Sequence, residues 1–526
     1  MRRFLVKACA ALLCACMLFL AVGCASHQCR FIEKSTEAQY RKSEATCLSP
    51  AEYYYSCSCG AKGEEVFTDG DLGDHRYTQK VAEERFFKSA ATKESPALYY
   101  LSCVCGLAGT ETFKHGGILL TAEEKKLYQP TSLTVTLYDS QELVYGFTYN
   151  TTKQPLDPVI QVKKNGEEAW SEYPLSSERS SSYNKDETRL TYYVTKGTVA
   201  LEANTTYIYR IYDKDADVGS EEATLTTKNP KADAFTFVHV SDSQDGPDYF
   251  KFALSSVVDR ADFLLHTGDV VESSKYEQEW TTMLDGSFEY LSQIPMMAIS
   301  GNHETTYKSG AYETYKHFHN KMPEQDTRAG YYYSFIYGNV KFIMLNTNVL
   351  ANNRLLDAQY EWLENELKTN TCKWTVVALH NPLYSVGKYG ANPDRNQIAL
   401  ALQTQLRGLF AQYGVDIVLQ GHDHAISRTF PIDADGVPQK ETVETIDGVA
   451  YSVDPSGVIY VMNGPAGSQT REPYSIDETL YAYAERSRPA SWAEFSFDDD
   501  TLTVTVKYRV GKTPGVYQTW GIKKTA

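Results

Sequence analysis

The sequence predicts a multidomain protein in which an α/β domain follows an all-β sandwich and two small cysteine-containing repeats. Beyond Ala234, apolar strand-like runs alternate with helical patterns, which is typical of α/β domains. From about Gln129 to Thr227, short runs of alternating polarity succeed one another and favour an all-β sandwich. Upstream of these, a 46-residue pattern occurs twice without a gap over residues 27–116.

The composition is that of a globular protein and excludes one class of partner. Of 526 residues, 42% are hydrophobic and 22% are charged, and the chain is long enough for several domains. The formal net charge is −16. Because nucleic-acid polymers are bound by extended basic surfaces, this balance argues against such a partner.

The first 24 residues have the pattern of a bacterial lipoprotein signal. Met1-Arg2-Arg3 and Lys7 precede an apolar run from Ala8 to Gly23, and Cys24 follows where a lipidated cysteine is expected. An ordinary secretory signal cleaved nearby is the alternative. No other run approaches the ~20 apolar residues that a membrane span requires. We therefore expect an exported protein, tethered to the bacterial membrane through lipid on Cys24 or else secreted.

Each of the two repeats is too small to bury much core, so each is expected to need a covalent or metal staple. Cys57-Ser58-Cys59-Gly60 of the first repeat recurs as Cys103-Val104-Cys105-Gly106 of the second. Export favours disulfides. The two sulfurs of one C-x-C motif make a poor bridge, however, because neighbouring strand residues point to opposite sides.

Zinc is the second staple that fits, and the sequence suggests two sites. One would be a four-sulfur site and the other would contain histidine, since His75 stands where the first repeat has Cys29. The first group is Cys29, Cys47, Cys57 and Cys59, and the second is His75, Cys103 and Cys105 with His115 as a further candidate. Disulfides, free cysteines and zinc all remain open, and the repeats could instead contact cell wall or a protein partner.

The sandwich is expected over residues 129–228 and the α/β domain over 234–525. Sandwich strands are predicted at Ser132 to Leu137, Leu143 to Tyr149, Val159 to Val162, Thr191 to Val194 and Tyr207 to Tyr212. The segment Leu201 to Tyr207 resembles the tyrosine corner of fibronectin type III domains. Helices of the α/β domain are predicted at Tyr249 to Asp259, Ala358 to Leu367 and Gln397 to Tyr413. Another strand is expected at Gly457 to Val461, and further β-rich runs lie between Trp492 and Ile522.

Five short motifs of the α/β domain each follow an apolar, strand-like run. They are Val240-Ser241-Asp242-Ser243-Gln244, Gly268-Asp269, Gly301-Asn302-His303-Glu304, Leu379-His380-Asn381 and Gly421-His422-Asp423-His424. Ligands at the carboxyl ends of neighbouring strands converge on one edge of a sheet. Carboxylates, an amide and imidazoles together suit two adjacent hard or borderline metal ions. His239 and His266 lie inside strand-like runs and match no motif ligand.

The order of these motifs resembles that of the calcineurin-like metallophosphoesterases, and within them the purple acid phosphatase branch. The resemblance covers about residues 234–525, and Met322-Pro323, the Tyr331–Phe335 segment and Gln359 to Leu363 also look like that branch. It implies a core of two packed sheets flanked by helices, with a small fibronectin type III-like domain just upstream.

The resemblance also implies a role for each matching residue. Asp242 and His424 would bind a first metal ion, while Asn302, His380 and His422 would bind a second. Asp269 would bridge the two ions, which are divalent or trivalent iron, manganese or zinc. In a two-metal site the ions lie ~3.5–4 Å apart, so one carboxylate can bind both.

Three further residues, in or just after the motifs, are assigned by the same resemblance. His303 would orient the phosphate and assist departure of the leaving oxygen. Gln244 stands where many relatives have histidine, so we expect a weak ligand or a supporting donor. Glu272 stands where purple acid phosphatases have a tyrosine, so we expect a protein that is not purple.

The function implied is that of an exported binuclear phosphoesterase. A metal-activated hydroxide would attack a small phosphorylated substrate, with phosphomonoesters favoured as in acid phosphatases. A phosphodiesterase or nucleotide hydrolase on the same residues is one alternative. A non-enzymatic surface-binding protein, acting through the repeats and the sandwich, is the other.

Overall fold

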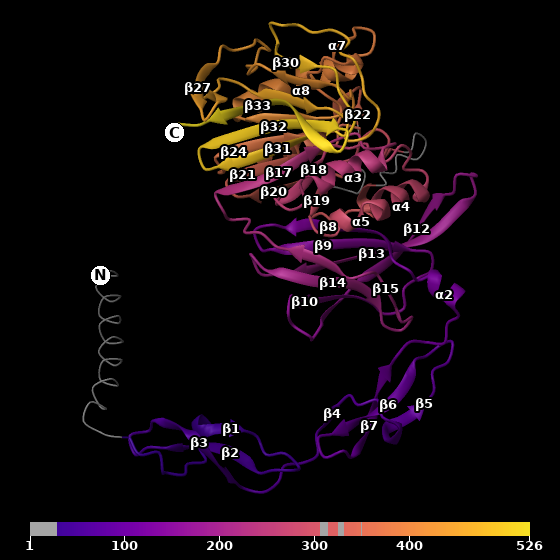
Figure 1. Ribbon diagram of the computed structural model, residues 1–526, viewed down its shortest axis with the longest axis vertical. Coiled ribbons are helices and arrows are strands. Elements are labelled where there is room, and N and C mark those ends of the chain that lie inside the picture. The colour runs from indigo at the N-terminus through magenta and orange to yellow at the C-terminus, as the bar shows by residue number, and fades with distance from the viewer. Residues whose placement is uncertain (1–28, 306–313, 325–330, 349, 526) are drawn as a thin grey trace. The chain divides into compact units, whose positions relative to one another are not determined.

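The computed structural model describes residues 29–305, 314–324, 331–348 and 350–525 (Figure 1). The predicted signal segment and Cys24 lie outside the described residues. The chain divides into two compact units, Met1–Leu119 and Leu120–Ala526. No helix in the described part of the chain is long and apolar enough to cross a membrane.

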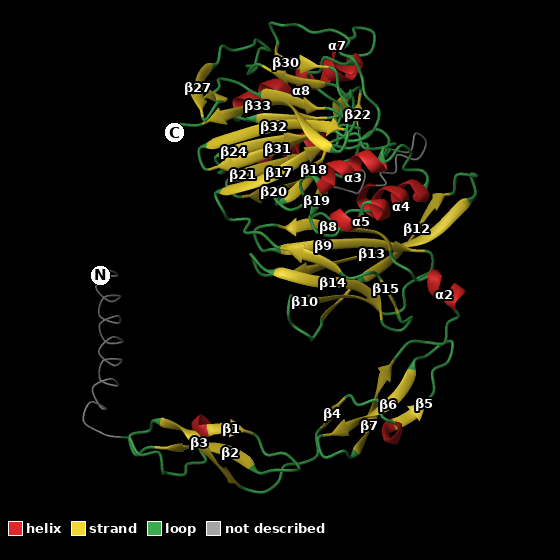
Figure 2. Ribbon diagram, in the orientation of Figure 1, coloured by secondary structure: helices red, strands yellow, loops and turns green. Residues whose placement is uncertain are grey.

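The first unit contains two small β modules, each with a 3-10 helix followed by three strands, and the second module has one more strand before its helix (Figure 2). Their cores are small: in the first module Ala51, Tyr53 and Phe67 form the only buried cluster among the described residues. The first module comprises η1 (Ala38–Tyr40), β1 (Arg41–Ser43), β2 (Ala51–Ser56) and β3 (Lys62–Asp69). The second comprises β4 (Tyr77–Gln79), η2 (Glu84–Phe86), β5 (Phe87–Ser89), β6 (Ala97–Cys103) and β7 (Ala108–His115).

The second unit begins with the short helix α2 (Ala122–Lys126) and a two-sheet β sandwich. In α2, Thr121 and Glu124 form a reciprocal capping box. One sheet has the order β12-β13-β9-β8, and the other contains β11-β10-β14-β15 with β16 paired to β14. The strands are β8 (Thr131–Asp139), β9 (Val144–Thr151), β10 (Pro158–Lys164), β11 (Ser171–Pro174), β12 (Ser176–Tyr183), β13 (Arg189–Ala200), β14 (Thr206–Asp213), β15 (Val218–Gly219) and β16 (Ala223–Thr226).

The sandwich buries aromatic side chains between its sheets and ties down one corner with a tyrosine. The ring of Phe147 on β9 lies 5.3 Å from that of Tyr209 on β14, edge to face. The Tyr207 hydroxyl accepts the backbone N–H of Glu202 at 3.0 Å. This bond has the form of a tyrosine corner, in which a buried tyrosine fixes the chain a few residues upstream.

The α/β domain consists of two mixed sheets. The first has the order β19-β18-β17-β31-β32-β33-β28-β27, and the second has the order β20-β21-β24-β25-β29-β26-β30. The first comprises β17 (Ala234–Val240), β18 (Phe263–His266), β19 (Met296–Ala298), β27 (Thr442–Ile446), β28 (Val449–Val453), β31 (Trp492–Asp498), β32 (Thr501–Val510) and β33 (Thr513–Lys523). The second comprises β20 (Tyr333–Tyr337), β21 (Val340–Met344), β24 (Trp374–Ala378), β25 (Ile417–Gln420), β26 (Ile426–Thr429), β29 (Ile459–Asn463) and β30 (Tyr481–Glu485).

Aromatic side chains fill the space between the two sheets. Phe237 of β17 and Phe263 of β18 each stand edge-on to Phe342 of β21, at 5.2 and 5.4 Å between ring centroids. All three are fully buried and belong to one hydrophobic cluster. This packing holds the parallel strands β17, β18 and β19 of one sheet against β21, β24 and β25 of the other.

Helices cover the outer faces of the two sheets (Figure 2). Phe250 of α3 and Trp280 of α4 are buried in the same cluster as β17 and β18. Trp362 of α6 and Leu402 of α8 pack with apolar residues of β24 and β25. The helices are α3 (Pro247–Ser255), α4 (Glu277–Gly286), α5 (Phe288–Leu291), α6 (Asp357–Lys368), α7 (Lys388–Ala391) and α8 (Gln397–Gln412), with η3 (Thr314–Lys316) and the hairpin β22 (Leu350–Ala351) and β23 (Arg354–Leu355) between them.

Candidate metal centre

The predicted ligands come from loops that follow five strands of the α/β domain. Asp242, Asp269 and Asn302 follow β17, β18 and β19, which run parallel in the first sheet. His380 follows β24, and His422 and His424 follow β25, parallel strands of the second sheet. The carboxyl ends of these strands therefore meet at one edge of the paired sheets.

Four of these ligands have a backbone conformation that non-glycine residues rarely adopt. The φ angles of Asp242, Asp269, His422 and His424 are +51°, +56°, +73° and +50°. Such left-handed residues cost of order 1–3 kcal/mol each and cluster at functional sites. His422 and His424 thus lie on a bent segment, which lets their two rings reach different groups of ligands.

Two glycines allow the ligand loops to approach one another closely. A Cβ atom on Gly301 would lie 2.1 Å from Oδ1 of Asp269. A Cβ on Gly421 would lie 2.3 Å from the Ser241 hydroxyl oxygen and 3.1 Å from Oδ2 of Asp242. No larger residue fits at Gly301 without displacing the Asp269 carboxylate, or at Gly421 without displacing the Ser241 hydroxyl.

The carboxylates and imidazoles form two groups that share Asp269. Ligand atoms of Asp242, Asp269 and His424 lie within 4.8 Å of one another, and so do those of Asp269, His380 and His422. Nε2 of His424 is 3.3 Å from Oδ1 of Asp242, and Nε2 of His380 is 3.2 Å from Oδ2 of Asp269. These two groups contain the carboxylates and imidazoles that the resemblance assigns to a first and a second ion, and that assignment stays a prediction.

Carbonyl groups orient the two imidazoles so that Nε2 faces the centre. Nδ1 of His380 donates to the carbonyl oxygen of Thr267 at 2.8 Å, and Nδ1 of His424 donates to that of Gln469 at 2.7 Å. Such a bond fixes the tautomer of a metal-binding histidine. Oδ1 of Asn302 lies 3.1 Å from Nε2 of His380, so the amide oxygen belongs to the same cluster.

His303, Glu272 and Gln244 surround this cluster. Nδ1 of His303 donates to the Glu272 carbonyl oxygen at 2.5 Å, and its Nε2 lies 3.8 Å from Oδ2 of Asp269. The Glu272 side chain is 46% exposed and accepts from Nε2 of Gln469 at 3.2 Å. Gln244 is buried beside Asp269, whose carbonyl oxygen accepts its backbone N–H at 3.2 Å.

The electrostatics of the cluster are set by burial and by opposite charges. Burial lowers the pKa of His380, but the adjacent Asp269 carboxylate outweighs it and raises that pKa to about 9. Burial raises the pKa of Asp242, yet His424 and His380 hold it below its usual value. Burial, together with the charge of His380, lowers the pKa of His422 to about 3. A metal ion must displace the proton that His380 and Asp269 share, so its binding releases protons.

The donor set fits two borderline or hard metal ions. Asp242, Asp269, His380 and His424 are each at most 2% exposed, and buried charges of this kind require pairing or a metal. Oε1 of Gln244 is also buried and has no hydrogen-bond partner among the described residues. Oxygen and imidazole ligands of this kind suit manganese, iron or zinc.

Two histidines, His239 and His266, match no motif ligand, and the structure places them within strands, where they form hydrogen bonds to neighbouring loops and strands. Nδ1 of His239 accepts from the Asn463 amide at 2.7 Å, and its Nε2 donates to the Thr267 hydroxyl at 2.9 Å. His266 bonds the Ser243 hydroxyl at 3.0 Å. Both rings are fully buried.

The sequence assigns no role to Glu304, the last residue of the motif that begins at Gly301. Glu304 is fully buried, and its carboxylate accepts backbone N–H groups from the loops that carry Asp269 and Asn302. Burial and the nearby Asp269 carboxylate raise its pKa to about 7. Its place directly after Asn302-His303 was the only signal in the sequence.

Comparison with known proteins identifies the domain. Residues 235–425, which contain all six predicted ligands, match the family model for calcineurin-like phosphoesterases. Purple acid phosphatase 23 of Arabidopsis thaliana is 28% identical over 200 residues, 37% of this chain and 38% of that protein. Acid phosphatase type 7 of Mus musculus is 24% identical over 251 residues, 44% of this chain and 52% of that protein. The chain therefore spans only a third to a half of the curated relatives it matches.

Solved structures share the fold. Purple acid phosphatase PPD1 from yellow lupin seeds superposes with a TM-score of 0.63 at 18% identity, over 75% of this chain and 74% of that one. The structure of PhoD superposes with a TM-score of 0.54 at 14% identity, over 75% and 90%. Residues 235–425 thus match the calcineurin-like phosphoesterase family, and the chain is similar to purple acid phosphatases in sequence and to PPD1 in fold.

Proposed function

We propose that this chain is a metal-dependent hydrolase of phosphoric esters whose centre holds two metal ions. The observation that carries the proposal is the position of Asp269, which belongs to both ligand groups. One carboxylate shared between two such groups is the arrangement that a two-metal site requires. Asp242 and His424 would complete the first group, and Asn302, His380 and His422 the second.

The ions would supply a hydroxide nucleophile at neutral pH and neutralise charge on the phosphoryl group. The residues of this chain supply the remaining parts. The carbonyl groups of Thr267 and Gln469 hold the imidazoles of His380 and His424 in the tautomer that leaves Nε2 free to bind. Glu304 fixes the loops that carry Asp269 and Asn302 by accepting their N–H groups.

His303 is the proposed proton donor to the leaving oxygen. Its side chain is 28% exposed, so a substrate can reach it, and its Nδ1 is held by Glu272. Burial lowers the pKa of His303, but the Asp269 carboxylate and the Glu272 carbonyl together raise it above its ordinary value. A proton on Nε2 can therefore be given to a departing alkoxide, a step typically worth ~10²–10⁴-fold.

A leaving-group series tests this role. An alkyl phosphate needs its leaving oxygen protonated, whereas nitrophenolate departs readily without help. His303→Ala should therefore lower kcat/KM on the alkyl ester by ~10²-fold or more, and far less on the nitrophenyl ester. Equal losses on both would contradict the proton-donor role, and unchanged metal content would show that the centre stays intact.

Phosphomonoesters are the proposed substrate class, as the acid phosphatase names of the relatives suggest. The test compares nitrophenyl phosphate with bis(nitrophenyl) phosphate and with nucleotides on protein loaded with manganese, iron or zinc. Faster turnover of the monoester supports the proposal. A preference for the diester would replace it with a phosphodiesterase, and no turnover of any ester by the metal-loaded protein would contradict hydrolysis altogether.

Export and membrane anchoring are proposed from the sequence of the first 24 residues. A charged start, an apolar run and Cys24 support a lipidated N-terminus. The protein should fractionate with membranes and be released by Cys24→Ser. Equal membrane association of the two forms would contradict the anchor.

A further inference from the structure

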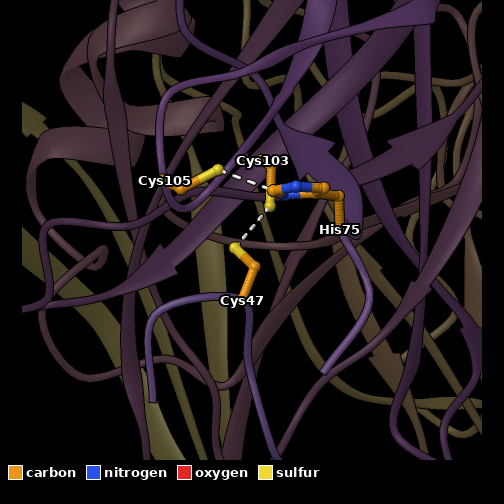
Figure 3. Close-up of side chains that lie close together, drawn as sticks. All are labelled: Cys47, His75, Cys103 and Cys105. Carbon is orange, nitrogen blue, oxygen red and sulfur yellow. Dashed lines mark hydrogen bonds between the residues drawn. The ribbon is translucent and has the colours of Figure 1, made fainter. Parts of the chain in front are cut away.

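Four metal-binding side chains of the first unit gather at the junction of its two repeats, far in sequence from the phosphoesterase ligands. They are Cys47, His75, Cys103 and Cys105, and one ligand atom of each lies within 4.8 Å of the others. Sγ of Cys47 is 3.2 Å from Sγ of Cys103, and Sγ of Cys105 is 3.3 Å from Nδ1 of His75. Figure 3 shows the three sulfurs and the ring edge pointing toward one another.

The grouping differs from the one predicted, in which Cys47 joined Cys29, Cys57 and Cys59. The structure leaves those three sulfurs together without it and places Cys47 in the second group. His115, the further candidate, is instead packed edge-on against the Tyr99 ring at 5.6 Å. The predicted partition is therefore wrong at Cys47, because it followed proximity in sequence.

The backbone explains why Cys47 reaches the second repeat. The carbonyl oxygen of Thr46 accepts the N–H of Gly73 at 2.9 Å, two residues before His75. A Cβ atom on Gly73 would lie only 2.5 Å from the carbonyl oxygen of Ala45, so this close approach needs glycine. The loop that carries Cys47 is thus held against the start of the next repeat.

The two C-x-C-G motifs fold into the same turn. The N–H of Gly60 donates to the Cys57 carbonyl at 2.7 Å, and that of Gly106 donates to the Cys103 carbonyl at 2.8 Å. Both glycines are left-handed, with φ of +86° and +85°. The turn brings both cysteines of a motif to one side, which an extended strand would not do.

We propose that Cys47, His75, Cys103 and Cys105 form a structural zinc site that cross-links the two repeats. Three thiolates and one imidazole are a common tetrahedral zinc set, with Zn–S near ~2.3 Å and Zn–N near ~2.0 Å. Ligands at such distances lie about 3.4–3.8 Å apart, which small side-chain rotations would reach from the observed positions. The hydrophobic core around Tyr53 and Phe67 is small, so the unit would gain stability from a metal cross-link.

The second repeat lacks a cysteine at the position that corresponds to Cys47 of the first. In the second repeat Lys93 stands at the position of Cys47, and the carbonyl of its neighbour Thr92 accepts the N–H of Leu119 at 2.8 Å. The bond is the counterpart of the one between Thr46 and Gly73. The first repeat thus holds Cys47 against the second, whereas the same position of the second repeat is Lys93, which is not a zinc ligand.

Cobalt(II) tests the site in the full chain, because thiolate-bound cobalt absorbs by charge transfer from sulfur and the oxygen and imidazole ligands of the phosphoesterase centre cannot produce this band. Cys59→Ser provides the background, since it disables the three-sulfur group. In that background we expect one cobalt–thiolate band. Adding Cys47→Ser should weaken cobalt binding at the site that gives this band by at least tenfold. Cys372→Ser, a cysteine of the α/β domain, should leave the band unchanged. No band in the background protein, or a band indifferent to Cys47→Ser, would overturn the proposal.

Counting thiols in denatured, chelator-treated protein without reductant separates zinc from a disulfide, even for a variant that folds poorly. If Cys47 is a zinc ligand, Cys47→Ser titrates one thiol fewer than the wild type. If Cys47 is bridged to Cys103 or Cys105, the substitution frees the partner, and one thiol more is titrated. The first result supports the proposal and the second contradicts it.

Discussion

Glu304 holds the backbone of Asp269 in place: its Oε2 accepts the Asp269 N–H at 2.8 Å. The same oxygen accepts the N–H of Gly301 at 2.6 Å, and Oε1 accepts that of Val270 at 2.8 Å. One buried carboxylate therefore joins the loop of the shared ligand to the loop that carries Asn302. Because both side-chain oxygens accept backbone N–H groups, this position requires a carboxylate, which is the only side chain with two acceptor oxygens.

Glu304→Gln should consequently disrupt the centre although the side chain keeps its size. Its amide nitrogen would face two backbone N–H groups and leave them unpaired, at ~1–3 kcal/mol each. We expect a 10–100-fold loss of metal affinity or of kcat/KM, the effect typical of groups that support metal ligands. Glu289→Gln, which removes an exposed carboxylate that pairs with Lys251, is the control. Wild-type metal affinity and kcat/KM in Glu304→Gln would refute the positioning role.

Two glycine-to-alanine substitutions add the same methyl group at different places. One lies between the ligand loops and the other lies on an open face of a helix. Gly301→Ala places a methyl group 2.1 Å from Oδ1 of Asp269, so activity and metal binding should fall by more than tenfold. Gly408→Ala on α8 meets nothing within 4 Å, and should raise stability by up to ~1 kcal/mol through helix propensity. Measured activity and thermal unfolding of both variants test the pair. Full activity in Gly301→Ala would show that the two loops are not in contact.

His239 should make folding sensitive to acid. Burial lowers its pKa to about 3, so the unfolded chain binds a proton more readily than the folded one. Stability is then fully present above the unfolded pKa of ~6.5 and decreases as the pH falls below it, by about 2 kcal/mol at pH 5. His239→Gln can still form hydrogen bonds with Thr267 and Asn463. Between pH 7 and 5, its free energy of unfolding should fall by about 2 kcal/mol less than that of the wild type. Identical pH profiles for the two proteins would contradict a neutral, buried His239.

Iron-loaded protein should lack the purple colour of a phenolate complex. Glu272 occupies the position where purple acid phosphatases have a tyrosine, and a carboxylate gives no tyrosine-to-iron charge transfer. Visible absorption of the iron-loaded protein should therefore show no such band, while Glu272→Tyr should acquire one. A phenolate band in the wild type would contradict this account of the first metal ion.

Several elements of the α/β domain could be predicted because their signals are local. The helix expected at Gln397 to Tyr413 is observed as Gln397–Gln412, since its apolar residues recur with helical spacing. Helix α4 escaped prediction because it contains only three apolar residues, Trp280, Met283 and Leu284, which are too few to show a clear helical spacing. The short edge strands of the sandwich, such as β11 and β15, likewise carry little pattern of their own.

The candidate ligands could be named from their motifs, but the backbone conformations and hydrogen bonds that hold them in place could not. The positive φ angles of Asp242 and Asp269 and the contacts of Glu304 depend on loops from different strands meeting in space. Cys47 was assigned to the wrong group for the same reason: its partners are determined by how one repeat follows the other. Sequence spacing reports the ligand types, whereas nonlocal packing decides which ligands share an ion.

The most direct test of the central claim is a manganese titration followed by electron paramagnetic resonance and phosphate release. Manganese favours the oxygen and imidazole ligands of the phosphoesterase centre over the thiolates of the repeats. We predict two ions per chain, whose signals weaken through spin coupling as the second binds, with activity rising in step. Asp269→Asn should lose both the coupling and the activity. A single uncoupled ion, or full activity with one ion bound, would contradict a pair of ions bridged by Asp269.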